Sequence, residues 1–223
     1  MIGFVVAMRK EASLFLESVE VVEEKQIAGK SVYIGKCFNE DFALIIGGIG
    51  KVNVALSTQV LIDNFDVDKV INFGVAGGKE NSGLVAGDMV LVNKVCQYDF
   101  DLSEIDDVSV GYMQDYDTVF YNTDYENYTG NNFKICSCAT GDRFTSKEYF
   151  LNIIKDLGAK VVDMELGAIS QVCKANNKPI YSIKLISDVD GVEGSIFSQY
   201  QQNVKEVTMK IPSALKELIT NLR

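Results

Sequence analysis

Residues 69–78 read Lys-Val-Ile-Asn-Phe-Gly-Val-Ala-Gly-Gly. The first five form a short run that is typical of a strand buried on both faces of a parallel sheet. The glycine-rich turn after it allows a ligand to approach the backbone closely. Similar apolar runs occur at Ile2 to Ala7 and at Ile180 to Ile186. These three runs, with Lys69 to Phe73 among them, predict the buried centre of a parallel sheet.

Amphipathic helical patterns and further strands alternate with these runs. The helical patterns cover Lys51 to Phe65, a stretch from near Ser146 to Gly158, Glu165 to Asn176, and Phe197 to Leu222 with an interruption at Pro212. An antiparallel meander is expected at Val19 to Ile27, Ser31 to Phe38 and Phe42 to Ile46, and single strands at Met89 to Cys96, Phe133 to Ala139 and Ala159 to Val162. Strands that alternate with helices predict helices on both sheet faces. We expect one α/β domain over residues 1–223, with three α/β/α layers and a mixed, mainly parallel central sheet.

Three segments carry more specific expectations. In the helix expected at Lys51 to Phe65, four apolar residues lie mostly on one face: Val52, Leu56, Val60 and Ile62. The sequence Thr145-Ser146-Lys147-Glu148 is a capping box, which predicts a helix start near Ser146. Tyr98 to Tyr128 is acidic and aromatic without a clear period, and so long a loop in a compact domain is usually a lid or an interface segment.

The charged residues exclude several classes of function. The chain carries 31 acidic and 21 basic residues, a net charge of −10, and only three arginines, Arg9, Arg143 and Arg223. A nucleic-acid partner is not expected, since such proteins present basic surfaces. There is no histidine, which removes Ser-His-Asp catalysis and His-ligated zinc, so acid–base chemistry must use other side chains.

The cysteines and the apolar runs indicate in which cellular compartment the protein is expected. Five cysteines at irregular spacing imply no disulfide framework, and the Cys136 and Cys138 pair reads as part of a strand, so no metal site is expected. The longest apolar run, Phe42 to Gly50, is too short to span a bilayer. Met1 to Met8 lacks a preceding basic region and reads as a first strand and not as a signal peptide. We expect a cytoplasmic protein without a membrane partner.

Three carboxylates follow predicted strands. Glu11 comes after the first strand, Glu165 after Ala159 to Val162, and Asp188 after Ile180 to Ile186. Ligands of such folds bind outside the carboxyl ends of the strands, so these groups are expected at one edge. Each one singly also fits an ordinary helix-start or capping residue. The phosphate-loop and dinucleotide-binding spacings are absent, which weakens nucleotide-binding interpretations.

Six motifs in order along the chain carry a resemblance to a known family. They are Ala7-Met8-x-x-Glu11, Gly48-Ile49-Gly50-Lys51-Val52-Asn53, Gly74-Val75-Ala76-Gly77-Gly78, Thr140-Gly141-Asp142-x-Phe144, Asp163-Met164-Glu165 and Ile186-Ser187-Asp188. The chain resembles the 5′-methylthioadenosine/S-adenosylhomocysteine nucleosidases of the purine nucleoside phosphorylase superfamily. The resemblance implies a nucleoside phosphorylase-like fold and a homodimer. It also implies cofactor-free hydrolysis of 5′-thio-substituted adenosines to adenine and a thioribose, in methionine and S-adenosylmethionine salvage.

The resemblance also implies residue roles. Asp188 protonates adenine at N7, Glu11 activates water, and Glu165 accepts the ribose 2′-hydroxyl. The remaining implied contacts are the Met164 backbone at the sugar, Phe144, the Thr145 backbone, Ala76 and Gly77 at adenine, and Met8, Ile49 and Phe197 at the alkylthio end. The apolar members of this set also fit plain core packing. Burial would raise the pKa of the catalytic acid.

Three positions depart from the family pattern. Val75 stands where some members have a serine that steadies the catalytic aspartate, and Lys184 stands where many have arginine. The segment from Tyr98 to Tyr128, expected to reach the partner subunit's active site, is longer and more acidic than usual. These departures bear on the orientation of Asp188 and on the preferred 5′-substituent.

Alternatives remain open. A phosphorylase of the same superfamily would need more arginines or a helix-end cradle for phosphate. Hydrolysis of 6-amino-6-deoxyfutalosine or 5′-deoxyadenosine would use the same chemistry. A non-catalytic purine-binding relative is disfavoured by the presence of all three carboxylates, and adenine release from methylthioadenosine separates it from an enzyme.

Overall fold

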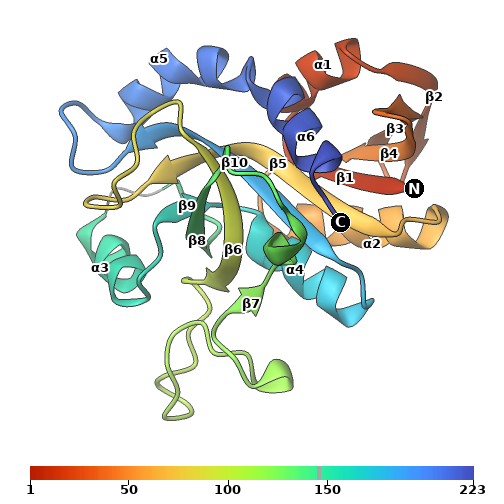
Figure 1. The fold of residues 1–223 in the computed structure, drawn as a ribbon. Coiled ribbons are helices and arrows are strands. Elements are labelled where there is room, and N and C mark those ends of the chain that lie inside the picture. Colours follow the sequence, from red (N-terminus) through yellow and green to blue (C-terminus); the bar gives the residue numbers. More distant parts are fainter. Residues whose placement is uncertain (145–146) are drawn as a thin grey trace.

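A mixed sheet runs through the centre of the chain (Figure 1). The computed structural model describes residues 1–144 and 147–223. Within these residues the ten strands are β1 (Ile2–Val6), β2 (Glu20–Ile27), β3 (Lys30–Cys37), β4 (Glu40–Ile46), β5 (Lys69–Gly78), β6 (Met89–Gln97), β7 (Tyr121–Asn122), β8 (Lys134–Thr140), β9 (Val161–Asp163) and β10 (Ile180–Val189). Their order is β10-β6-β8-β9-β5-β1-β4-β3-β2, and β7 pairs with β6.

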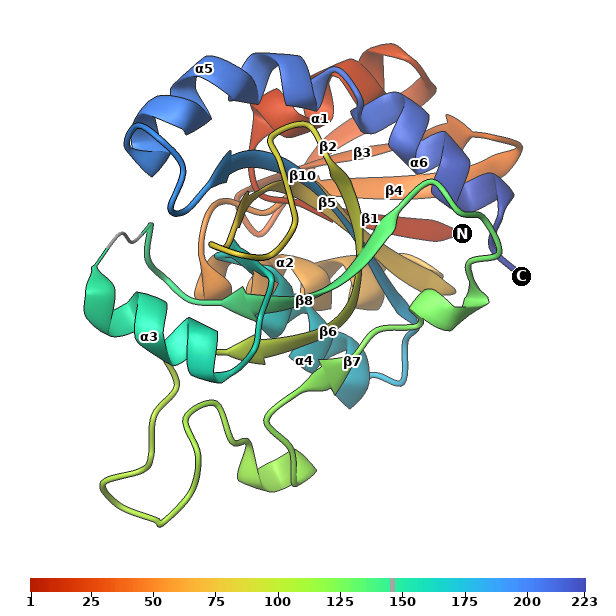
Figure 2. The same ribbon diagram turned by 60° about the vertical axis from the view of Figure 1, so that its left-hand side comes forward.

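Helices cover both faces of this sheet, so the predicted three layers are present. The helices of the described residues are α1 (Arg9–Glu17), α2 (Lys51–Asn64), α3 (Glu148–Asp156), α4 (Leu166–Ala175), α5 (Ile196–Thr208) and α6 (Ile211–Thr220). Helices α1, α5 and α6 lie on one face, and α2 and α4 pack together on the other (Figures 1 and 2). The C-terminal helical stretch divides just before Pro212, as expected, and Pro212 sits in the first turn of α6.

Part of the sheet closes on itself. Strand β10 pairs with β5 on one side and with β6 on the other, so β5, β9, β8, β6 and β10 form a closed circuit. In the described chain, parallel and antiparallel pairings are equal in number, because β6 and the predicted antiparallel meander β2-β3-β4 add antiparallel ladders. The sheet is therefore mixed, and parallel pairing is concentrated around β1 and β5.

The four apolar residues expected mostly on one face of α2 are not buried together, since Val60 and Ile62 pack partly buried against the core and the other two are exposed. Val52 is 82% exposed and Leu56 is 48% exposed, whereas Val54 and Leu61 are fully buried together with two hydroxyl residues. Those hydroxyls donate within the helix, from Ser57 Oγ to the carbonyl of residue 53 and from Thr58 Oγ1 to that of residue 54, at 2.8 and 2.7 Å. Because they are satisfied internally, they can pack against the sheet, while Val52 and Leu56 face outward.

The core lies in two main layers, one on each side of the sheet. On the α1 side, Phe4, Phe15, Phe42 and Phe73 pack edge to face, with ring centroids 5.0–5.9 Å apart. This packing fixes α1 against β1, β4 and β5. The first turn of α1 is thereby held beside the carboxyl end of β5.

The segment from Tyr98 to Tyr128 is mostly irregular, as expected. Only β7 and two single 3₁₀ turns, at Gln114–Tyr116 and Tyr125–Asn127, interrupt it. Its first half projects from the sheet in both ribbon views (Figures 1 and 2), and Ile105 there is 80% exposed. Such exposure of a large apolar side chain is consistent with an interface segment.

Two further sequence predictions concern the helix that starts near Ser146 and the lack of a membrane-spanning segment. Helix α3 runs over Glu148–Asp156, slightly inside the predicted range, and the capping-box residues Thr145 and Ser146 lie outside the described residues. None of the helices in the described ranges is both long and apolar enough to cross a bilayer.

Candidate active site

A cavity of about 480 Å³ opens at the carboxyl ends of β5, β9 and β10. Every predicted site residue within the described ranges lines it, while Thr145 lies outside those ranges. These lining residues are Met8, Glu11, Ile49, Ala76, Gly77, Phe144, Met164, Glu165, Asp188 and Phe197. The cavity therefore brings together residues that are up to 189 positions apart in the sequence.

Glu11 is held rigidly in the first turn of α1. Its carboxylate accepts hydrogen bonds from the backbone N–H of Met8 at 3.0 Å and from that of Val75 at 2.9 Å. Gly74 gives it room, because a Cβ at that position would lie 2.6 Å from Glu11 Oε1. Burial raises the pKa of Glu11 more than these bonds and the nearby Lys184 lower it. Glu11 is therefore a positioned base with an elevated proton affinity.

Glu165 lies at the start of α4, beside the first turn of α2. Its Oε1 accepts a hydrogen bond from the backbone N–H of Gly50 at 3.1 Å. Burial and the negative charge of Asp163 raise the pKa of Glu165 to about 7. The carboxylate thus links the glycine turn after β4 to the strand that ends at Asp163.

Asp188 projects from β10 at an irregularity in its pairing with β5, between Ile186 and Asp188. Ser187 Oγ donates to Asp188 Oδ2 at 2.6 Å. A Cβ at Gly77 would lie 3.0 Å from Asp188 Oδ1, so a glycine there allows the close approach. Burial raises the pKa of Asp188, although the Ser187 hydrogen bond and Lys79 act in the opposite direction.

Val75 lacks the hydroxyl that some family members have at this position, and a neighbouring residue supplies one. Its side chain is apolar, and its backbone N–H bonds to Glu11. Ser187, next to Asp188 in the chain, supplies the hydroxyl that steadies the aspartate. Sequence reasoning quoted Ser187 only as part of a motif and gave it no role.

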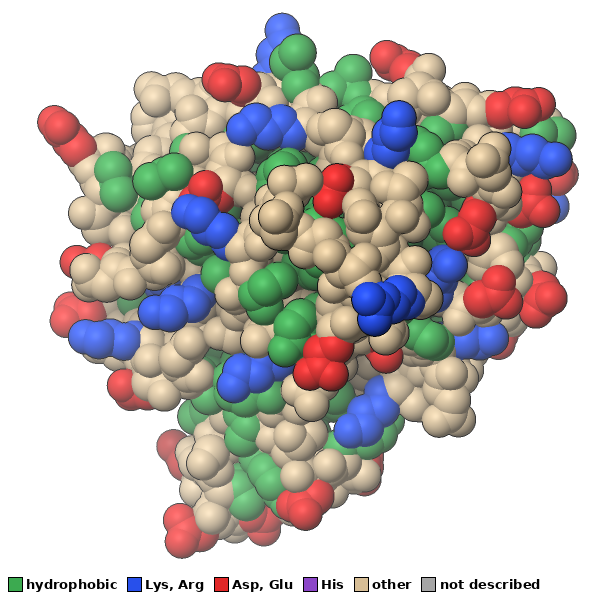
Figure 3. Space-filling view, in the orientation of Figure 1, with side chains coloured by type: hydrophobic (Ala, Val, Ile, Leu, Met, Phe, Trp, Pro, Cys, Tyr) green, Lys and Arg blue, Asp and Glu red, His purple; other side chains and the backbone are tan. Residues whose placement is uncertain are grey.

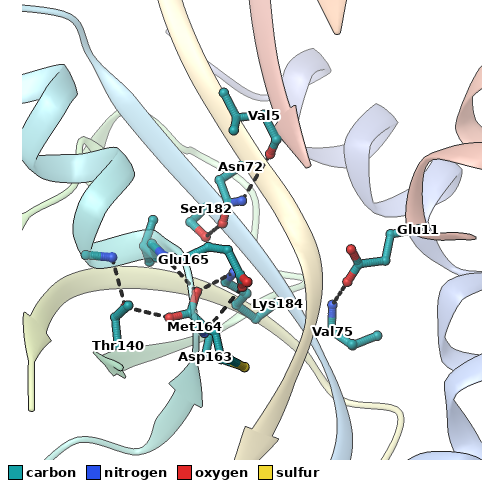
Figure 4. Close-up of polar contacts among 12 residues, drawn as sticks. Val5, Glu11, Asn72, Val75, Thr140, Asp163, Met164, Glu165, Ser182 and Lys184 are labelled. Atoms are coloured by element: carbon teal, nitrogen blue, oxygen red, sulfur yellow. Dashed lines mark hydrogen bonds and ion pairs between the residues drawn. The ribbon is translucent and has the colours of Figure 1, made fainter. Parts of the chain in front are cut away.

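Lys184 forms a buried ion pair that sequence reasoning missed. Lys184 Nζ lies 2.7 Å from Asp163 Oδ2, and both side chains are at most 2% exposed. Thr140 Oγ1 donates to Asp163 Oδ1 at 2.5 Å, and the backbone N–H of Leu166 donates to Oδ2 at 3.0 Å. Figure 4 shows the pair beside Glu165, with Glu11 farther to the right. A lysine within the apolar strand 180–186 was the available signal.

Mutual attraction keeps this pair ionised. Burial disfavours charge on both groups, but the carboxylate raises the pKa of Lys184, and the ammonium with its hydrogen bonds lowers that of Asp163. The ammonium of Lys184 also favours ionisation of both Glu11 and Glu165. A single buried cation therefore balances several carboxylates around the cavity.

Aromatic side chains form the outer wall. Phe144 lies 6.4 Å from Phe197 and 5.9 Å from Tyr200 between ring centroids. Phe144 and Phe197 are 55% and 54% exposed, which suits a stacking surface for a planar ligand. Tyr200, three residues after Phe197 on α5, was not predicted, although helical spacing places the two on the same face.

The other charges at the cavity are mostly paired. Lys79 Nζ lies 2.9 Å from Asp190 Oδ2, and the guanidinium of Arg143 stacks 4.4 Å from the Phe150 ring centroid. Among the described residues, no group of three or more His, Cys, Asp or Glu side chains is arranged to hold a metal ion. On the face of the molecule that Figure 3 shows, basic and acidic side chains are interspersed and do not form separate patches of one charge.

Chemically, the cavity combines three buried carboxylates of raised pKa with a largely apolar wall. Such groups can give and take protons near neutral pH.

Comparison with known proteins specifies the family. Residues 1–220 match the family model described as "Phosphorylase superfamily". A 5′-methylthioadenosine/S-adenosylhomocysteine nucleosidase of Oceanobacillus iheyensis is 31% identical over 97% of this chain and 99% of its own.

The chain belongs to this nucleosidase family within the phosphorylase superfamily. Solved structures agree. The nucleosidase of Helicobacter pylori, crystallised with butyl-thio-DADMe-Immucillin-A, superposes with a TM-score of 0.88 at 26% identity, covering 99% of this chain and 98% of that one. A futalosine hydrolase from Helicobacter pylori superposes with a TM-score of 0.87 at 27% identity, over 99% and 97% of the chains. The chain is thus an enzyme of the nucleoside hydrolase and phosphorylase superfamily with its fold.

Proposed function

We propose that this protein hydrolyses the N-glycosidic bond of 5′-methylthioadenosine and S-adenosylhomocysteine, releasing adenine and the 5′-substituted ribose. The observation that carries the proposal is the convergence of Glu11, Glu165 and Asp188 on one cavity, each buried and with a raised pKa. Cleavage of a ribose–base bond through an oxocarbenium-like transition state needs a general acid and an activated water. Two of the carboxylates meet these needs, and the third supports the sugar.

The three carboxylates have distinct proposed roles. Asp188, protonated because of its burial, donates its proton to N7 of the leaving adenine. Glu11 accepts a proton from the attacking water, and its two backbone hydrogen bonds fix the direction of its oxygens. Glu165 accepts the ribose 2′-hydroxyl, and its bond to Gly50 N–H sets its position. The assignment rests on family membership and on this geometry.

The cavity wall supports the rest of the nucleoside. Phe144 stacks on adenine, while Ala76 and Gly77 leave space for the ring edge near Asp188. Met164 seats the sugar, and Met8, Ile49 and Phe197 form an apolar surface for the alkylthio group. A bond from the Thr145 backbone to adenine stays a prediction.

Hydrolysis is favoured over phosphorolysis by the local charges. A bound phosphate would lie close to Glu11 and Glu165, and like charges in a desolvated site repel unless cations intervene. Arg9 turns toward the meander, where its guanidinium lies 3.7 Å from Glu24, and Lys79 and Lys184 are already paired. Water meets no such repulsion.

A futalosine-type nucleoside is the second candidate substrate, because a futalosine hydrolase shares this fold across nearly the whole chain. The test is adenine release from a panel of methylthioadenosine, S-adenosylhomocysteine, 5′-deoxyadenosine and 6-amino-6-deoxyfutalosine. The proposal expects the two thio-substituted adenosines to have the highest kcat/KM. A preference for the futalosine derivative would reassign the substrate. Release from none of the four would leave a purine-binding protein.

The proposal also covers assembly. A homodimer is supported by family membership and by the apolar side chains that α2 and the 98–128 segment expose: Val52, Leu56 and Ile105. A partner subunit would cover them and bring its 98–128 segment to the cavity.

We further propose that residues 1–223 act as one domain in the cytoplasm, without a cofactor.

A further inference from the structure

Lys10 stands at the outer edge of the cavity, against the aromatic wall. It lies in the first turn of α1, two residues after Met8 and next to Glu11, both of which line the cavity. Its ammonium donates a hydrogen bond to Tyr200 Oη and lies 4.8 Å from the centroid of that ring. Tyr200 itself lines the cavity and contacts Phe144. Lys10 thus adjoins Tyr200 at the end of the cavity where Met8 and Phe197 are proposed to hold the alkylthio group.

Hydrogen-bonding capacity remains at this point. The ammonium has three donors and uses one on Tyr200. Since Tyr200 Oη accepts that bond, its own proton is available to another acceptor. Within the described residues, Lys10 has no carboxylate within ion-pair distance, whereas Arg9, Lys79 and Lys184 each do. The edge therefore offers a cation and a hydroxyl donor in direct contact with each other.

The interior of the cavity presents the opposite charge. Glu11, Glu165, Asp163, Asp188 and Asp190 all line it. An anionic substituent is therefore disfavoured near the ribose site and is attracted to the edge, where Lys10 contacts Tyr200. Arg143 also lines the cavity, and its guanidinium stacks on the Phe150 ring.

We infer that Lys10 and Tyr200 form a carboxylate-binding site for the far end of the 5′-substituent. The substrate class selected is 5′-thio-substituted adenosines whose substituent ends in a carboxylate. The inference rests on the proposed function and specifies it, because a nucleoside with a short neutral substituent would not reach this pair. Lys10 and Tyr200 are specificity-determining residues, and they contact no atom that reacts.

The test uses two substrates of equal chain length. They are 5′-(3-carboxypropylthio)adenosine, which ends in a carboxylate, and 5′-butylthioadenosine, which ends in a methyl group. The quantity measured is the ratio of their kcat/KM values, carboxylate over methyl. Lys10→Gln is expected to lower this ratio about three- to tenfold, the effect of an exposed charge-assisted hydrogen bond. Tyr200→Phe should lower it less, and Lys10→Arg should largely retain it.

The control is Lys205→Gln, which removes an exposed lysine from α5, outside the cavity lining, and should leave the ratio unchanged. Raising the salt from about 0.05 M to about 0.5 M should lower the wild-type ratio, since exposed charges are screened. An unchanged ratio in Lys10→Gln, or an equal loss for both substrates, overturns the inference and leaves the proposed function standing. If neither adenosine is cleaved, the proposed function fails and the inference with it.

Discussion

At the scale of single residues, the site depends on carboxylates that burial makes hard to ionise. Glu11 and Asp188 are 3% and 4% exposed, so burial has the largest effect on their pKa values and the hydrogen bonds that reach them act against it. These two residues are the proposed proton-transfer groups. A positioned general acid or base typically contributes about 10²–10⁴ in rate.

Glu11→Gln and Asp188→Asn are each expected to lower kcat for methylthioadenosine at least ~100-fold, because each amide keeps the shape but cannot transfer the proton. Steady-state kinetics measures the loss, and an unchanged melting temperature shows that the fold persists. Near-native turnover in either variant would contradict the assigned role.

Glu165 is expected to make stability depend on pH. Its pKa of about 7 in the folded chain lies above the ordinary value of 4.5, so its contribution is fully present below the unfolded pKa and is lost as the pH rises through about 7. Glu165→Gln should therefore raise the melting temperature relative to wild type at about pH 8 by a few degrees, and by much less at about pH 5.

Differential scanning fluorimetry of the ligand-free protein across this range measures the difference. Glu206→Gln, which changes an exposed carboxylate on α5, serves as the control and should show no such pH dependence. A Glu165→Gln effect that is equal at both pH values would rule out the raised pKa as its cause.

The sequence predicted the positions of these carboxylates better than their partners. Glu11 and Glu165 each follow a strand and Asp188 lies near the end of β10, and the edge of a sheet brings such positions together. The Lys184–Asp163 ion pair depends on how β9 and β10 curve around the closed circuit, which no local pattern encodes. The side-chain hydrogen bond from Ser187 to its neighbour Asp188 occurs at the irregularity in the β5–β10 pairing.

At the scale of elements, the glycines of β5 leave room for the catalytic carboxylates. Gly74 and Gly77 face Lys184 and Asp188 in the β5–β10 register, and each leaves room for a carboxylate oxygen. Gly74→Ala would place a Cβ 2.6 Å from Glu11 Oε1, far inside contact distance. Glu11 must then move.

We expect Gly74→Ala to lower kcat by at least ~10-fold, because small misplacements of catalytic groups are costly. Crystallography of the variant should show Glu11 displaced from the Val75 N–H. The expected change in KM is small, since the bound nucleoside does not need Glu11 in its ground state. Wild-type kcat in a folded Gly74→Ala protein would show that the position of Glu11 is not critical.

Most element boundaries were predictable, but β5 continues through the expected glycine turn to Gly78 instead of ending at Phe73, and one helix face was not predicted. Strands such as β1 and β10 and the meander β2-β3-β4 followed from apolar runs and turn residues, close to their observed ends. On α2 the apolar pattern pointed to Val52 and Leu56, both of which are exposed, while Ser57 and Thr58 are buried. A surface reserved for another subunit has the same apolar pattern as a core face, so periodicity alone cannot separate the two.

At the scale of the whole molecule, this exposed face leads to a prediction about assembly. One chain has a mass of 24.6 kDa, and light scattering at micromolar concentration should return about twice that mass if Val52 and Leu56 lie in a dimer interface. Val52→Glu should shift the protein toward the single-chain mass, because it places a charge in the apolar contact. A wild-type protein at the single-chain mass would contradict the dimer.

The overall architecture was predictable to the level of layers and sheet type, and the resemblance of six motifs supplied the fold family. The closure of β10 onto both β5 and β6 was not, because it arises from long-range pairing between strands about 90–110 residues apart. That closure places β5, β9 and β10 around one cavity. The proposed chemistry depends on this arrangement.

The most direct test of the central claim is cleavage of methylthioadenosine in phosphate-free buffer, followed by addition of phosphate and identification of the sugar. The account predicts adenine and free methylthioribose, formed at a rate that phosphate does not change, because Glu11 activates water in a cavity whose charge repels a phosphate dianion. A strict requirement for phosphate, with methylthioribose 1-phosphate as the product, would contradict it.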